Sequence, residues 1–161
     1  MVDKHGTVTQ RSDFSKAQVK QVAAFEKSYT AAVNKLASNP TAKTTVSVGA
    51  GKTQTVTAGF VARAAANRVV EAAPSVTGRA GAVTHADGMG GEMTTVNAPG
   101  LRGNPVYGGA INSEEMRQMV VVHEAMHGTY VDSSFAGNEE FQKAHQLPYD
   151  GAALDLLRNN Q

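Results

Sequence analysis

The sequence feature that most constrains the fold is a His-Glu-x-x-His motif formed by His123, Glu124 and His127, directly after three valines at 120–122. Residues four apart lie one turn above each other on the same face of an α-helix. Two imidazoles at this spacing can bind one divalent ion, with the glutamate beside them facing a bound water molecule. The motif therefore predicts a helix that carries a metal site. The alternative is an ordinary helix whose two histidines bind no metal.

The absence of cysteine narrows the chemistry available to this site. Disulfides, thiolate zinc sites and cysteine nucleophiles are excluded, so any metal must be bound by histidine, aspartate or glutamate. Zn²⁺ is the expected ion, because a catalytic zinc takes three such protein ligands and keeps a fourth position for water. Zinc would activate that water, and Glu124 would accept its proton as the general base.

The third ligand is expected downstream of the motif, where Asn138-Glu139-Glu140 opens the next predicted helix. Glu140 is the first choice and Glu139 the second, because the loop before them can bring a carboxylate back over the motif helix. The alternative for this glutamate pair is a solvated helix start that complements the helix dipole. Three other residues are weaker candidates for the same position: Asp132, His145 and Asp150.

Length and charge limit the class of protein. The 161 residues predict a single domain over 1–161. The net charge is +1, from 15 basic and 14 acidic residues, and no basic stripe is present, which argues against a nucleic-acid partner. The chain has no apolar run of about 18 residues, so no membrane span is expected. The first residues lack the apolar core of a signal peptide. We therefore expect the protein to stay inside the cell, to leave it without a cleaved signal, or to derive from a longer polypeptide.

Helices are predicted where apolar residues recur at three- and four-residue steps. Five segments have this pattern: 13–37, 58–73, 113–130, 139–144 and 152–158. The second of them has Val69 and Val70 on its predicted buried side, and the third carries the motif. Pro148 is expected to separate the last two, because proline interrupts a helix interior.

Strands are predicted in two places. The β-rich stretches 44–48 and 54–57 flank a glycine-containing turn and predict a hairpin. The glycine-dense segment 74–109 is expected to form loops around one strand at 93–96. The stretch 92–96 is either an exposed edge that pairs with an extended peptide or an interior strand of a small sheet. Together these elements predict an α+β fold, in which helices pack on a small, mostly antiparallel sheet and the motif helix lies at the floor of a cleft.

Several polar residues outside the motif are candidates for supporting roles. A hydrogen-bond donor to the oxygen on which negative charge develops is needed for amide hydrolysis. Tyr130 and Tyr149 are the candidate hydroxyls and His145 is the alternative, although a structural role is expected for each of them. In the glycine-dense segment, His85 and Asp87 are expected to be polar loop residues, with a second metal site or a substrate contact as the alternative.

The segment 114–158 resembles the zincin metallopeptidases. More narrowly, it resembles the small single-domain effector and toxin metallopeptidases that bacteria deliver through specialised secretion systems. Three stretches carry the resemblance: Val120-Val121-Val122-His123-Glu124-Ala125-Met126-His127, Asn138-Glu139-Glu140, and Leu147-Pro148-Tyr149-Asp150 before an apolar terminal helix. In such proteins an acid downstream of the motif is commonly the third ligand, which agrees with Glu139 or Glu140.

The resemblance implies a zincin-like fold and a zinc-dependent metalloendopeptidase that is secreted or delivered into a target cell. The substrate would be a protein or peptide, and an immunity protein or a carrier from the secretion machinery would be a partner. Three alternatives remain: a housekeeping protease, a cell-wall amide hydrolase, and a non-catalytic interaction module in which zinc is structural or absent.

Overall fold

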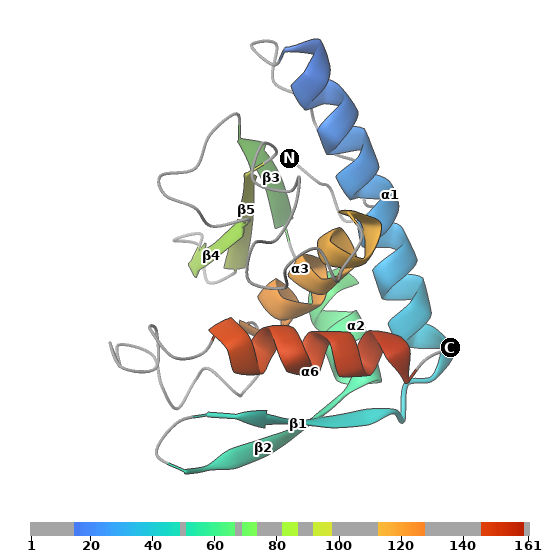
Figure 1. Ribbon diagram of the computed structural model, residues 1–161, viewed down its shortest axis with the longest axis vertical. Coiled ribbons are helices and arrows are strands. Elements are labelled where there is room, and N and C mark those ends of the chain that lie inside the picture. The colour runs from blue at the N-terminus through green and yellow to red at the C-terminus, as the bar shows by residue number, and fades with distance from the viewer. Residues whose placement is uncertain are drawn as a thin grey trace.

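The computed structural model describes residues 15–48, 51–66, 69–73, 82–86, 92–97, 113–127 and 146–159 (Figure 1). In chain order its elements are α1 (Lys16–Ser38), β1 (Lys43–Ser47), β2 (Thr53–Thr57), α2 (Ala58–Ala66), β3 (Val69–Ala73), β4 (Ala82–Ala86), β5 (Glu92–Asn97), α3 (Ser113–His127) and α6 (Gln146–Arg158). Helices combined with small sheets form an α+β architecture, as predicted. Among the described helices, none has the length and hydropathy that a bilayer-spanning segment requires.

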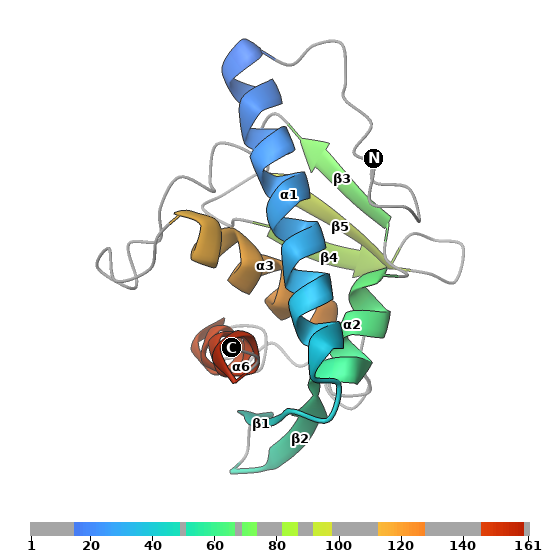
Figure 2. The same cartoon turned by 90° about the vertical axis from the view of Figure 1, so that its right-hand side faces the viewer.

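The long helix α1 confirms the helix predicted at 13–37 within the described residues. Its buried side chains Phe25, Tyr29, Ala32 and Leu36 follow each other at steps of three and four, which places them on one face. The helix ends shortly before Pro40, because proline disfavours the helical conformation in the residue that precedes it. Figure 2 shows α1 crossing α3 and α2, so its buried face covers one side of the core.

The predicted hairpin is present as β1 and β2, which pair antiparallel from Lys43 opposite Thr57 to Ser47 opposite Thr53. Exposed and buried residues alternate along β1, and its apolar face packs against α6. Gly51 in the turn has a φ of 71°, a left-handed conformation that glycine adopts without a steric penalty.

The second sheet corrects three sequence-based predictions. The helix predicted at 58–73 ends at Ala66, and Val69–Ala73 is a strand that pairs in parallel with β5. The β-branched Val69 and Val70 suit a strand, and their pairing with β5 outweighs the weak helical periodicity. The loops predicted around 93–96 contain the further strand β4, so His85 lies in a strand.

The third correction concerns the position of β5 in the sheet. The order is β3-β5-β4, with β4 antiparallel to β5. The segment 92–96 is therefore interior, and the alternative of an exposed edge at this strand is wrong. The described strands form two separate small sheets, and antiparallel pairing holds for β1 with β2 and for β4 with β5.

The last two described helices, α3 and α6, pack against each other in the core. Helix α3 confirms the predicted motif helix from Ser113 to His127. Helix α6 begins at Gln146, six residues before the predicted start at 152, and Pro148 lies within its first turn. Proline is tolerated there because the amide hydrogens of the first turn have no intrahelical partner. The helix predicted at 139–144 and residues 128–130 lie outside the described residues.

Helix α3 is the central element of the core. It contacts α1, α2 and α6, and it also contacts β4 (Figures 1 and 2). The core consists of apolar side chains from these helices and from the hairpin. The largest fully buried ones are Tyr149, Leu36, Met119, Met126, Leu156, Val46, Val56, Val61 and Val122.

Polar contacts near its N-terminal end also join α3 to its neighbours. The Arg117 Nε donates a hydrogen bond of 2.9 Å to the Oγ of the buried Ser28 on α1. Ser28 in turn donates to the Ala24 carbonyl at 2.9 Å, so its hydroxyl both accepts and donates a hydrogen bond. Near the same N-terminal end of α3, Glu115 pairs with Arg158 of α6 at 2.9 Å. This partly exposed ion pair contributes only about 0–1 kcal/mol.

A close backbone contact joins the start of α2 to the segment after α1. The Gly59 amide donates to the Pro40 carbonyl at 2.9 Å, and the Ala58 amide donates to the Ala42 carbonyl at 2.9 Å. A Cβ atom at position 59 would lie 2.8 Å from the Pro40 Cβ and 3.0 Å from the Pro40 carbonyl oxygen. Only glycine allows this approach without a shift of the backbone.

We expect Gly59→Ala to lower the free energy of unfolding by about 1–3 kcal/mol, because the added methyl group overlaps the Cβ and the carbonyl oxygen of Pro40. The matched control is Gly151→Ala, which lies inside α6 and whose Cβ would meet no described atom within 4 Å. It should raise the free energy of unfolding by about 0.4–1 kcal/mol through helix propensity. Urea unfolding followed by circular dichroism measures both, and equal stability of the two variants would contradict the contact.

Candidate metal centre

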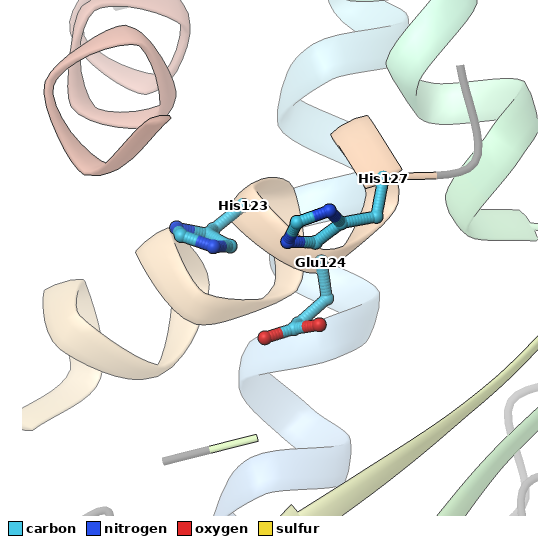
Figure 3. Close-up of side chains that lie close together, drawn as sticks. All are labelled: His123, Glu124 and His127. Atoms are coloured by element: carbon cyan, nitrogen blue, oxygen red, sulfur yellow. The ribbon is translucent and has the colours of Figure 1, made fainter. Parts of the chain in front are cut away.

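Helix α3 brings the three motif residues together on one side of the helix. The potential ligand atoms of His123, Glu124 and His127 all lie within 4.8 Å of one another. The two imidazole centroids are 5.1 Å apart (Figure 3). Figure 3 shows both rings leaving α3 one turn apart, with the Glu124 carboxylate close to them. The spacing in the sequence therefore produces the predicted cluster.

The cluster is mostly withdrawn from solvent. His123 is 4% exposed and Glu124 is 7% exposed, whereas His127 is half-buried. Low solvent access strengthens electrostatic interactions between charged groups and an ion. The more open side of the cluster is thus the side of His127, at the C-terminal end of α3.

Helix α6 supplies a carboxylate to the first histidine. The Oδ1 atom of Asp150 lies 2.7 Å from the Nδ1 atom of His123. Asp150 is 1% exposed, so the contact is buried on both sides. An ionised carboxylate only accepts hydrogen bonds, so the Nδ1 of His123 donates and carries the proton. In a neutral ring this leaves the lone pair on Nε2, which is the atom available to a metal ion.

Tyr149 packs against both imidazoles. Its ring centroid is 5.4 Å from that of His123 and 5.2 Å from that of His127, and the residue is fully buried. Tyr149 begins the apolar face of α6, which continues with Ala153 and Leu156 at helical spacing and packs on α3. The same packing that buries this face therefore places Tyr149 and its neighbour Asp150 beside the motif.

The donor set suits a transition metal. Imidazole nitrogens bind zinc, copper, iron and nickel well, and a carboxylate completes many such sites. Nitrogen ligands lie about 2 Å from a zinc ion. Small side-chain rotations would therefore let His123 and His127 share one ion. Glu124 is close enough either to bind that ion or to act on a water molecule beside it.

The described residues show only part of the predicted site. His123, Glu124 and His127 are brought together, and Tyr149 joins them. The predicted third ligands Glu139 and Glu140 lie outside the described residues. Four further candidates also lie outside the described residues: the weaker ligand candidates Asp132 and His145, the candidate oxyanion donor Tyr130, and Asp87.

Comparison with protein-family models, with curated proteins and with solved structures gives no match. The chemistry of this centre has to be inferred from its own residues.

Asp150 is the site residue whose role the sequence did not indicate. It was a weak candidate for a direct ligand, whereas the structure pairs it with the Nδ1 of His123 and leaves it out of the ligand cluster. One signal for this role is present in the sequence. Asp150 lies between Tyr149 and an apolar helical stretch. The helix has to bury its apolar residues, and Asp150 at its start is an acid that is buried with them.

We expect His127→Ala to weaken zinc binding by more than about 100-fold, because removing a direct ligand exceeds the loss typical of outer-shell changes. Glu124→Gln is the matched control in the same cluster and should bind zinc as the wild type does. Metal content after reconstitution and dialysis, measured by atomic emission spectrometry, distinguishes them. Zinc retained by His127→Ala at the wild-type level would contradict the assignment of this histidine as a ligand.

Proposed function

We propose that this protein is a zinc-dependent metallopeptidase of the zincin type, with His123 and His127 as zinc ligands and Glu124 as the general base. The observation that carries this proposal is the His-Glu-His cluster on α3, in which His123 and Glu124 are buried and His127 is half-buried. The pairing of Asp150 with Nδ1 supports it, because it leaves Nε2 of His123 available to the ion.

The residues of the cluster divide the chemistry between them. Zinc, when bound, supplies a positive charge that polarises a water molecule and lowers its pKa towards 7. The Glu124 carboxylate accepts a proton from the water whose oxygen attacks the carbonyl carbon of the peptide bond. Glu124 then delivers this proton to the amide nitrogen as the carbon–nitrogen bond breaks. The products are a carboxylic acid and an amine, and Glu124 returns to its initial ionised form.

A third protein ligand is part of the proposal. Catalytic zinc sites hold three protein ligands and one exchangeable position, whereas structural sites hold four ligands. Glu140 remains our first choice and Glu139 our second, for the reasons given by the sequence.

The substrate would enter along β4. Among the described strands, β4 pairs only with β5, so its other side is an edge. Figure 2 shows β4 as the strand of its sheet nearest to α3, and the two elements are in contact. An extended peptide can add to such an edge through main-chain hydrogen bonds that tolerate many side chains. The pairing edge is therefore placed at β4 and not at 92–96, which lies in the middle of its sheet.

We expect Glu124→Gln to reduce proteolysis by about 10²–10⁴-fold, because the amide cannot accept the proton of the attacking water. Its zinc content should stay at the wild-type level. The matched control is Glu115→Gln on the same helix, which alters the ion pair with Arg158 and leaves the motif residues unchanged. Digestion of an unfolded protein such as casein, followed by mass spectrometry, measures the rates. Wild-type activity in Glu124→Gln would refute the proposed mechanism.

We further propose that the peptidase acts as a delivered bacterial effector or toxin, with an immunity protein as its natural partner. This proposal rests on the family resemblance of the segment 114–158 and on the absence of cysteine, which suits passage between reducing and oxidising compartments.

Expression in the bacterial cytoplasm, and separately in the periplasm, should slow growth in at least one compartment for the wild type. Glu124→Gln at the same protein level should be tolerated in both, because the toxicity would require hydrolysis. Growth curves with matched immunoblots provide the measurement. Equal tolerance of the two proteins in both compartments would argue against a toxin.

A further inference from the structure

We propose that Asp150 is a positioning residue for His123, so that the terminal helix α6 is a working part of the metal centre. This inference rests on the proposed metal site and concerns how that site is held. The carboxylate of Asp150 would fix the tautomer and orientation of His123, and would thereby keep Nε2 directed at the ion.

The geometry of the pair supports a fixed tautomer. The Oδ1–Nδ1 distance of 2.7 Å is short, as expected for a hydrogen bond to an ionised group. The side chains of His123 and Asp150 are 5% and 2% exposed, so water does not compete with the contact. A metal-bound histidine typically donates its other ring nitrogen to a carboxylate or carbonyl group in this way.

The packing of α6 keeps Asp150 in place. Its neighbour Tyr149 is fully buried against both imidazoles, and Ala153 and Leu156 continue the buried face on α3. At the end of the helix, Arg158 pairs with Glu115 of α3. His123 and Asp150 are 27 residues apart in sequence, so their contact exists only when α6 is docked. Metal binding and the docking of α6 should therefore stabilise each other.

The tautomer can be tested without any metal. In the long-range ¹H–¹⁵N spectrum of metal-free protein at about pH 8, the Nδ1 of His123 should be protonated. His123→Gln assigns the signal. In Asp150→Ala this preference should be lost, whereas Asp150→Asn should keep it, because the amide oxygen can still accept from Nδ1. An unprotonated Nδ1 in the wild type would overturn the proposal.

Zinc affinity provides the second test, by competition with a chromophoric chelator. We expect Asp150→Ala to weaken zinc binding by about 10–100-fold, and Asp150→Asn to weaken it less. The matched control is Asp155→Asn on the same helix, an exposed residue whose contact with Thr44 is long, at 3.4 Å. It should bind zinc as the wild type does. If Asp150→Ala does not fold, Asp150→Asn and the wild-type spectrum still decide the question.

The outcomes separate this inference from the proposed function. Zinc binding by Asp150→Ala that equals the control would overturn the positioning role and leave the peptidase intact. A loss as complete as that of His127→Ala would make Asp150 a direct ligand and would also overturn it. A wild type that binds zinc with the expected dependence on Asp150 but cleaves no peptide would refute the peptidase alone. A wild type that binds no zinc would overturn both.

Discussion

The packing of α3 against three other helices is the constraint on which the rest of the structure depends. Met119, Val122 and Met126 are almost completely buried between α1, α2 and α6. Each such side chain contributes about 1.5–3 kcal/mol relative to an exposed position. Val122 and Met126 directly precede His123 and His127 in the same helix. The burial of these apolar residues therefore also determines where both imidazoles lie. The site is thus built on a rigid element rather than on a loop.

The fold could be predicted where its signals are local. The periodicity of α1, the alternation in the hairpin and the motif helix each lie within one stretch of sequence, and all three are present. The prediction was wrong where distant pairing decides the structure. Val69–Ala73 has apolar residues that fit a helix, and only β5, more than twenty residues later, makes it a strand. The order β3-β5-β4 likewise follows from no local pattern.

The same distinction applies to the candidate metal centre. His123, Glu124 and His127 could be identified because the geometry of one helix brings them together. Asp150 comes from another helix, and no spacing rule connects it with His123. Because Pro148 was expected to separate two helices, the predicted start of the last helix, at 152, also lay beyond Asp150. Since proline in a first turn costs no hydrogen bond, the helix includes both residues that contact the imidazoles.

The buried pair of His123 and Asp150 is not explained by a contribution to the stability of the fold. A hydrogen-bonded polar pair in a core contributes little net free energy, because desolvation offsets most of the attraction, and apolar replacements are often neutral or stabilising. Here the pair is buried next to Tyr149, on two helices whose other buried side chains are mostly apolar. Departures from the rules of core packing are expected at functional sites. The carboxylate of Asp150 contacts the Nδ1 atom of His123 and leaves Nε2 for the proposed ion. A metal centre uses such a contact, whereas a purely structural core does not need it.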